Sequence, residues 1–540
     1  YVGATVTEQK AEYADVTMIF SNLLGYQISN VKMDGMLVNG QGANSKEQEA
    51  VPYEQYQDGD FYYVKVRMWP NGRYRDSYEI SSFGIQLGSS TLQEVKNVNR
   101  TVGVSFYKPV SMENWLTAFD DREGNYRLVG DIDLAGFQGQ QQAATKIFSG
   151  RTGSGNGIKG KIEGDGHSIR NIELTDSQCA FIPYVDGAQI RNLTFQNVTL
   201  GRPDANNNDY MGIFGQAVNQ TGLEGIYVQN VTLNNPYRYG GGIVGSISSS
   251  TIRDSGVQEM TVKADRQTSE LRLGGVVGYL DYSSAENCYR AGLDMSVSNA
   301  QANVRGVGGI AGEMTYAATL SDGYAQGRIY TVAGDVGGIA GATDGIVNRF
   351  WSKVDISGSG NAGGIVGRAQ SNSRMAQLLS IGNVGGQESY TGRIVGAKVS
   401  EGTTLTNAFG YSGQKLNGVV KPEDPMDANG LMDSKQLMDP TYYWNNVNLG
   451  YDFRYTDKAE DPKGVEQGYL PLLYNNAQTE LLKYQKDMIF MLSSDTVSLT
   501  TGEPAPSANY ETATNAYTYS FNLVLRTPGV SQALFDEQYN

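Results

Sequence analysis

The sequence is poor in the residues that many catalytic and metal-binding motifs require. It has one histidine and two cysteines in 540 residues. The zincin motif H-E-x-x-H needs two histidines and therefore does not occur. A histidine-based triad would have to use His167, which follows the run Gly164-Asp165-Gly166. We expect His167 to lie in an exposed turn that leads into a strand, without a catalytic role.

Cysteine, proline and long apolar runs are also scarce. Cys179 and Cys288 are too few for a disulfide framework, and each stands among apolar residues, so we predict two buried free thiols. Only 14 residues are proline, and glycine does not recur at every third position, which excludes a collagen-like chain. No apolar run approaches the length of a membrane-spanning helix, so we expect no membrane insertion by a helix.

Basic residues are outnumbered by acidic ones. The 42 Lys and Arg against 57 Asp and Glu give a net charge of −15, which argues against a nucleic-acid partner. The sequence begins at Tyr1 without a methionine or targeting tract and ends at Asn540 without an anchor motif. We therefore expect a processed piece of a longer protein.

Glycine, by contrast, is abundant, with 67 residues in 540 against a usual share of about 7 %. Much of it stands in one recurring motif, in which Gly-Gly is followed by two apolar residues and another Gly. The last residues of successive copies lie 26 to 34 positions apart, which indicates a structural repeat. The full copies are Gly241–Gly245, Gly274–Gly278, Gly308–Gly312, Gly337–Gly341 and Gly363–Gly367, and weaker copies are Met211–Gly215 and Gly392–Gly396.

Between the glycine motifs lie short β-prone runs such as Thr251–Ser255, Ala285–Tyr289 and Thr319–Tyr324. Two or three strands per repeat without a helical period predict a parallel β-solenoid, in which stacked coils share one core. Glycine at the corners would permit left-handed φ values and leave no Cβ to collide with the next coil. A propeller blade needs a longer repeat, and the leucine-rich motif is absent. Crossover chirality favours a right-handed solenoid.

We predict an all-β chain of four regions. Residues 1–108 form a small β-sandwich, 109–414 the β-helix with an N-terminal cap, 415–485 its closing segment with a Tyr-rich loop, and 486–540 the start of a further β domain. A short amphipathic helix at Met112–Phe119 is placed to cover the end of the core, and Tyr126–Leu134 is expected to be the first strand.

Three segments offer ligand-binding chemistry without specifying it. Asp204–Asp209 has oxygen ligands at alternate positions, but it lacks the turn glycine and distal glutamate of an EF-hand, so we interpret it as a solvated insert rather than a calcium site. Tyr237–Tyr239 and Tyr442–Trp444 could stack on sugars, although cross-strand packing is the expected role. We assign no catalytic, metal or cofactor residue.

The glycine motifs resemble the bacterial GLUG repeat. The runs Gly130–Leu134 and Gly160–Ile172 resemble the entry coil of the same surface proteins. These features occur in the non-catalytic part of secreted zinc metallopeptidases that cleave immunoglobulin A and in adhesin-like proteins. The resemblance covers about residues 110 to 475 and implies an extracellular or cell-surface location. The family's zinc motif is absent from this sequence, so no catalytic or metal residue is carried over.

Three functions therefore stay open. The first is a non-catalytic scaffold that displays adjacent domains and holds a host protein or glycan. The second is an accessory substrate-recognition region of a secreted zinc metallopeptidase whose catalytic domain lies outside this chain. The third is a polysaccharide lyase, because parallel β-helices include such enzymes. Such a lyase would need a cluster of carboxylates, and the sequence does not show which of its 57 acidic residues would form one. We expect no enzyme activity in these residues and no cofactor.

Overall fold

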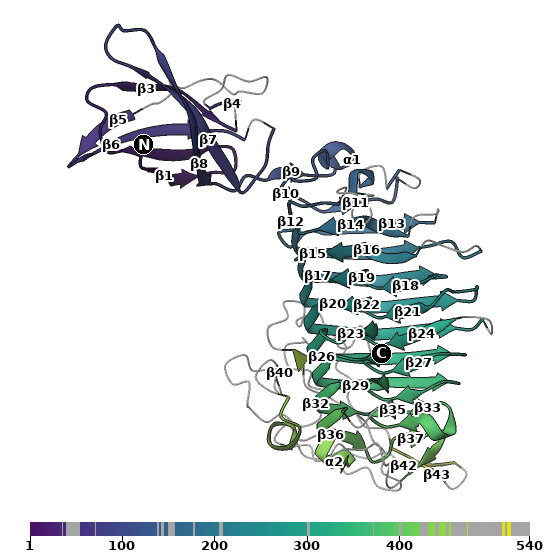
Figure 1. Ribbon diagram of the computed structural model, residues 1–540. Coiled ribbons are helices and arrows are strands. Elements are labelled where there is room, and N and C mark those ends of the chain that lie inside the picture. The colour runs from purple at the N-terminus through teal and green to yellow at the C-terminus, as the bar shows by residue number, and fades with distance from the viewer. Residues whose placement is uncertain are drawn as a thin grey trace.

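The chain is almost entirely β structure, arranged as a parallel solenoid of about eight turns beside antiparallel sheets (Figure 1). The predicted fold class is confirmed, and the hand of the solenoid stays a prediction. The computed structural model describes residues 1–34, 36–38, 54–70, 72–137, 140–141, 145–148, 157–175, 179–204, 209–299, 303–370, 372–398, 402–421, 430–437 and 442–449, with the strand segments 453–454, 472–473, 510–513 and 516–519. No helix among these residues is long and apolar enough to cross a membrane.

The N-terminal region is built from two four-stranded antiparallel sheets. Alternating buried side chains such as Val16, Val66 and Ile80 face a shared core between the sheets. This is the two-layer arrangement expected of a sandwich. One sheet has the order β1 (Gly3–Gln9), β2 (Ala14–Phe20), β6 (Phe61–Met68) and β5 (Glu54–Asp58), and the other β4 (Met36–Leu37), β3 (Gln27–Met33), β7 (Ser77–Gln86) and β8 (Gln93–Gly103).

Each central coil of the solenoid has one long strand and two short ones, and each strand pairs in parallel with its equivalent in the next coil (Figure 1). The long strands are β15 (Gln189–Leu200), β17 (Gly222–Asn234), β20 (Thr251–Ala264), β23 (Ser284–Val297), β26 (Thr319–Thr331) and β29 (Ile346–Gly358). The short ones are β16 (Tyr210–Val218), β18 (Tyr239–Gly241), β19 (Val244–Ser248), β21 (Leu271–Gly274), β22 (Val277–Asp281), β24 (Val304–Gly308), β25 (Ala311–Met314), β27 (Asp335–Gly337), β28 (Ala340–Thr343), β30 (Ala362–Gly363), β31 (Val366–Ala369), β34 (Thr391–Gly392) and β35 (Val395–Lys398).

Equivalent inward residues stack into columns along the solenoid. Ile252, Ala285 and Leu320 are register partners in successive coils, and all three are fully buried. The same hydrophobic cluster runs from Val110 in the first rung to Leu416 near the last. One coil could not bury this surface alone, so the stack supplies the core.

The glycine motifs occupy the bend between the two short strands, where the backbone of the next coil leaves no room for a side chain. A Cβ atom on Gly309 would lie 2.1 Å from the carbonyl oxygen of Gly338 in the next coil, and one on Gly275 would lie 2.0 Å from that of Gly309. The predicted exclusion of side chains is confirmed. The prediction of left-handed φ is wrong for these residues, which do not have positive φ values.

The left-handed residues lie instead within the long strands, mostly at asparagine and aspartate. Asp254, Asn287 and Asp322 have φ values of 50°, 53° and 58° and occupy one register column. In a second column, the amide of Asn230 donates to that of Asn197 over 2.9 Å. Asn and Asp tolerate this conformation because their short polar side chains form local hydrogen bonds. These left-handed residues bend each long strand so that its two halves lie on different sides of the solenoid.

The entrance to the solenoid differs from the prediction in two respects. β9 (Lys108–Val110) pairs in parallel with β10 (Tyr126–Leu128), so the stack begins before the predicted first strand, and β11 (Ile132–Asp133) is separate from β10. The predicted helix is a single turn, α1 (Trp115–Ala118). A short cap suffices because the buried ring of Trp115 covers the core, with its centroid 5.7 Å from that of Phe137. The entry coils then continue through β12 (Lys161–Glu163), β13 (Ser168–Leu174) and β14 (Ala180–Asp186).

The C-terminal segment packs along the side of the stack as well as at its end. Tyr289, Tyr324 and Trp351 form an outward column, with neighbouring ring centroids 5.5 Å and 4.6 Å apart. Met432 and Val447 are buried in the same cluster, so this segment covers the column. The prediction that residues 415–485 close the solenoid stays a prediction, and this packing along the side is an additional feature. The last coils of the stack contain β32 (Arg374–Ser380), β33 (Val384–Gly385), β36 (Thr404–Tyr411) and β37 (Lys415–Leu416). The elements that follow are β38 (Val419–Val420), β39 (Leu431–Met432), α2 (Ser434–Leu437), η3 (Tyr443–Val447), β40 (Phe453–Arg454), β41 (Leu472–Leu473), β42 (Tyr510–Ala513) and β43 (Ala516–Tyr519).

Replacing Gly309 with valine should destabilise the solenoid by about 1–3 kcal/mol, because the new side chain overlaps the next coil's backbone. The free energy of unfolding in urea measures this loss. Gly130→Val is the matched control, since a Cβ there meets no atom within 4 Å. Equal stability of the two variants would contradict the assigned coil contact.

Both thiols are predicted to resist labelling in the folded protein. Cys179 and Cys288 are buried and free, as the sequence predicts, and burial raises the pKa of Cys288 to about 12. At pH 8 this thiol stays protonated, and the protonated form is a poor nucleophile. An excess of a disulfide reagent should react with both thiols only after a denaturant is added. Rapid reaction of either thiol without denaturant would contradict the packing.

Candidate functional site at the sandwich–solenoid junction

His167 lies just before β13, as the sequence predicts, but its side chain is only partly exposed. Its Nδ1 atom is 3.5 Å from Oδ1 of Asp131, and its side chain is 35 % exposed. The backbone N–H of Ser168 donates to the same carboxylate over 2.9 Å, and this bond is the main cause of the lowered pKa of Asp131. These contacts hold the turn against the preceding coil.

The tyrosines proposed as sugar platforms lie in different environments. The ring of Tyr239 stacks on Tyr210 at 5.0 Å and tilts against Tyr279 at 5.6 Å, so the expected cross-strand packing is confirmed there. The guanidinium of Arg272 lies 5.4 Å from the same ring and bonds to Glu313 over 2.5 Å. Tyr442 is half-buried against the C-terminal cluster. The side chains of Tyr443 and Trp444 lie outside the described residues.

Residues 205–208 of the Asp204–Asp209 segment, which the sequence predicts to be a solvated insert, lie outside the described residues. Elsewhere in the described ranges, no group of three or more His, Cys, Asp or Glu side chains is arranged to hold a metal ion. The most connected set of polar contacts between separate segments lies where the two folded units meet, a place that no single motif of the sequence marks.

Asp76 is the centre of the polar contacts that join the sandwich to the solenoid. One of its carboxylate oxygens accepts from Ser105 Oγ and Asn125 Nδ2, both over 3.0 Å, and lies 2.9 Å from Lys161 Nζ. Asp76 precedes β7, whereas Asn125 and Lys161 belong to the first coils. One side chain thus connects both units and the linker.

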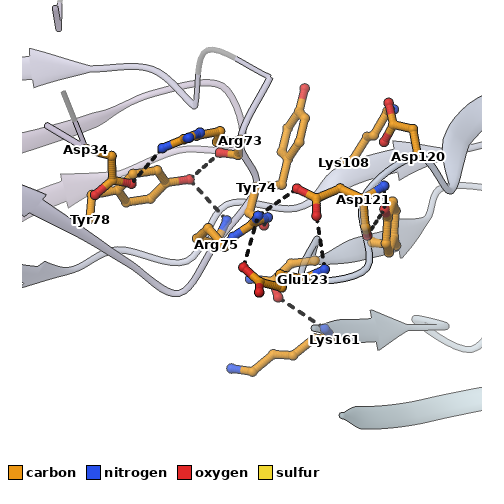
Figure 2. Close-up of polar contacts among 12 residues, drawn as sticks. Asp34, Arg73, Tyr74, Arg75, Tyr78, Lys108, Asp120, Asp121, Glu123 and Lys161 are labelled. Atoms are coloured by element: carbon orange, nitrogen blue, oxygen red, sulfur yellow. Dashed lines mark hydrogen bonds and ion pairs between the residues drawn. The ribbon is translucent and has the colours of Figure 1, made fainter. Parts of the chain in front are cut away.

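Arg75 adds a second set of ion pairs to the junction (Figure 2). Its Nη2 atom lies 2.6 Å from Asp121 and 3.6 Å from Glu123, and both acids precede β10. Backbone bonds reinforce the joint, because the N–H of Asn125 donates to the Tyr74 carbonyl over 2.9 Å. Phe106 in the linker is buried. Exposed pairs contribute little singly, but a connected network with backbone bonds resists bending.

A cleft of about 770 Å³ opens at this junction. Its walls come from the turn between β1 and β2, the segment between β6 and β7, the linker and β10. Because distant segments form it, the cleft depends on the fixed placement of the two units. Its lining includes Lys10, Trp69, Tyr74, Tyr107 and Arg127.

Similarity to known proteins covers about half of the chain. An immunoglobulin A1 protease of Streptococcus pneumoniae is 25 % identical over 283 residues, which are 52 % of this chain and 13 % of that protein. An immunoglobulin A1 protease of Streptococcus sanguinis is 26 % identical over 283 residues, which are 51 % of this chain and 14 % of that protein. The chain therefore spans only a small part of the curated relatives that it matches.

A Bacteroides ovatus protein provisionally assigned as an immunoglobulin A1 protease is similar in structure, with 15 % identity and a TM-score of 0.32. That match covers 67 % of this chain and 89 % of the other. No family model matches the chain. The matches to the streptococcal proteins support the predicted relationship to immunoglobulin A proteases as homology over half the chain, and the assignment to GLUG repeats stays a prediction.

Removing the Asp76 carboxylate should loosen the junction. In Asp76→Ala, Ser105, Asn125 and Lys161 lose a shared partner, so the linker should open more often. Chymotrypsin should then cleave after Phe106, which is buried in the parent, several times faster. Asp294→Ala is the control, because it removes an exposed pair with Arg328 far from the linker. Equal cleavage rates in both variants would contradict the role of Asp76.

Proposed function

We propose that this chain is a non-catalytic region of a large secreted or cell-surface protein, in which the solenoid holds the N-terminal sandwich in a fixed position. The observation that carries this proposal is the junction centred on Asp76 and Arg75, which joins the sandwich to the first coils. The continuous core then extends that fixed placement along the stack. Such a unit sets the distance and orientation between the domains at its ends.

The relatives favour a second, more specific candidate. Because the matched proteins are immunoglobulin A1 proteases, we propose as an alternative that this region contributes to recognition of an immunoglobulin substrate. In that case the catalytic domain belongs to another part of a longer protein. The polysaccharide lyase alternative is supported by the fold class alone.

The scaffold proposal predicts one narrow distance between the two units. Ser89 and Glu173 are exposed, and the native thiols are buried, so Ser89→Cys with Glu173→Cys can be labelled selectively. Spin labels at these positions should give a single narrow distance distribution that broadens when Arg75→Met and Asp76→Asn are added. A broad distribution in the otherwise native chain would contradict a fixed junction.

The recognition alternative is tested separately with immobilised full chain. Selective binding of immunoglobulin A1 over immunoglobulin G, measured by interferometry, supports substrate recognition. Equal or undetectable binding of the two immunoglobulins contradicts it and leaves the scaffold proposal standing.

A further inference from the structure

The junction cleft has aromatic walls of a kind that suits a sugar ring. Trp69 and Tyr74 come from the segment between β6 and β7, and Tyr107 comes from the linker. All three are half-buried, so their rings are held by packing while part of each stays accessible. Aromatic rings in this state present a flat apolar face and, in Tyr and Trp, a polar edge. The volume of about 770 Å³ falls within the usual range of small-ligand sites.

Arg127 gives the cleft a cation that forms no ion pair with a carboxylate of the described residues, although the carboxylate of Glu12 also lines the cleft. Its guanidinium lies over the ring of Tyr107 at 4.6 Å, and its Nε atom is buried without a hydrogen-bond partner. The Oε1 atom of its register neighbour Glu163 accepts from Asn192 Nδ2 over 3.0 Å and from the Asp165 N–H over 3.1 Å. An arginine fixed in this way is ready to pair with an incoming carboxylate.

The other cation of the cleft is already paired. Lys10 lies in the turn between β1 and β2, and its Nζ atom is 2.8 Å from a carboxylate oxygen of Glu8 in β1. Arg127, at the solenoid side of the cleft, is therefore the cation that would bind an anionic group of a ligand. A ligand that reaches it must pass beside the aromatic rings, so one molecule would contact both features.

The backbone around Arg127 favours a saccharide over a peptide. β10 is paired on both sides, with β9 and with β12, so it offers no free edge to which an extended peptide could add as a strand. Without a main-chain ladder, recognition depends on ring faces and on the charged group. A saccharide that carries a carboxylate meets both requirements.

We propose that the cleft between the sandwich and the first coil binds an acidic saccharide, whose carboxylate pairs with Arg127 while a sugar ring packs against Trp69 and Tyr74. This inference deepens the binding role within the proposed function and rests on the fixed junction. Val129 also lines the cleft and is 54 % exposed, so a charge introduced there would face the ligand without disturbing the core.

The test uses the full chain and a tetrasaccharide of alternating glucuronic acid and N-acetylglucosamine, with neutral tetra-N-acetylglucosamine as its counterpart. Calorimetry at low salt should detect binding of the acidic sugar and at least tenfold weaker binding of the neutral one. Arg127→Gln should weaken binding of the acidic sugar roughly ten- to hundred-fold, as expected for a charge-assisted hydrogen bond. Val129→Glu should also weaken it, by repulsion.

Matched variants separate a local effect from a general one. Arg191→Gln removes the same charge from the same register column as Arg127, but its partner Glu224 lies outside the cleft, so binding should be unchanged. Val419→Glu places a new charge at an exposed residue that does not line the cleft, with the same expectation. Thermal melts check that all variants are folded.

Three results would overturn the inference. The first is equal affinity for the acidic and neutral sugars, which includes no binding of either. The second is an equal loss of affinity for the acidic sugar in Arg127→Gln and Arg191→Gln. The third is an acidic peptide of alternating Glu and Ala that binds through Arg127 as tightly as the sugar does. The spin-label distance involves no sugar. A narrow distance without sugar binding would therefore overturn this inference alone and leave the scaffold proposal standing.

Discussion

The close backbone contact between successive coils is the constraint on which the rest of this structure depends. Every strand of a central coil uses its hydrogen bonds to join the coils before and after it, so neither coil is complete without its neighbours. At the glycine bends, the space between coils is too small for even one Cβ atom. The apolar core, the polar columns and the placement of the N-terminal sandwich all follow from that stacking.

Stacking also turns single residues into columns whose chemistry fixes the register. Arg127, Glu163, Arg191, Glu224, Arg253 and Glu286 are register partners in successive coils, so positive and negative side chains alternate along the outer face. Arg191 lies 3.3 Å from Glu224, and Arg253 lies 2.9 Å from Glu286. If a strand paired with the coil after its proper neighbour, like charges would lie side by side. Their repulsion disfavours that incorrect pairing. The column begins at the junction cleft, where Arg127 lacks a preceding acidic neighbour.

The repeated parts of the fold were the most predictable from sequence. The spacing of the glycine motifs identified the coils, because each repeat meets the same steric requirement at the same bend. The sequence was a poorer guide to backbone conformation. Left-handed φ values were expected at glycine but occur mainly at residues such as Asp254 and Asn287, where local hydrogen bonds make the conformation tolerable.

Features formed by contacts distant in sequence could not be predicted in this way. Arg290 is fully buried and donates to the carbonyls of Val257 and Gly292, although equivalent positions in other coils hold small or apolar residues. The C-terminal segment covers Trp351 through contacts between segments far apart in the chain. The cleft likewise combines residues from Gln9 to Val129, each of which is unremarkable in its own segment. Only the folded arrangement brings them together.

Together these features describe a stack of coils that carries a small β unit at one end and forms a cleft where the two meet. The central claim is that stacking and the junction make these parts one body. Hydrogen exchange of the full chain, followed by mass spectrometry, tests it most directly. We expect peptides from the central coils and from the linker around Phe106 to be strongly protected together. Linker amides that exchange as fast as those of an unfolded peptide, beside a protected solenoid, would contradict the account.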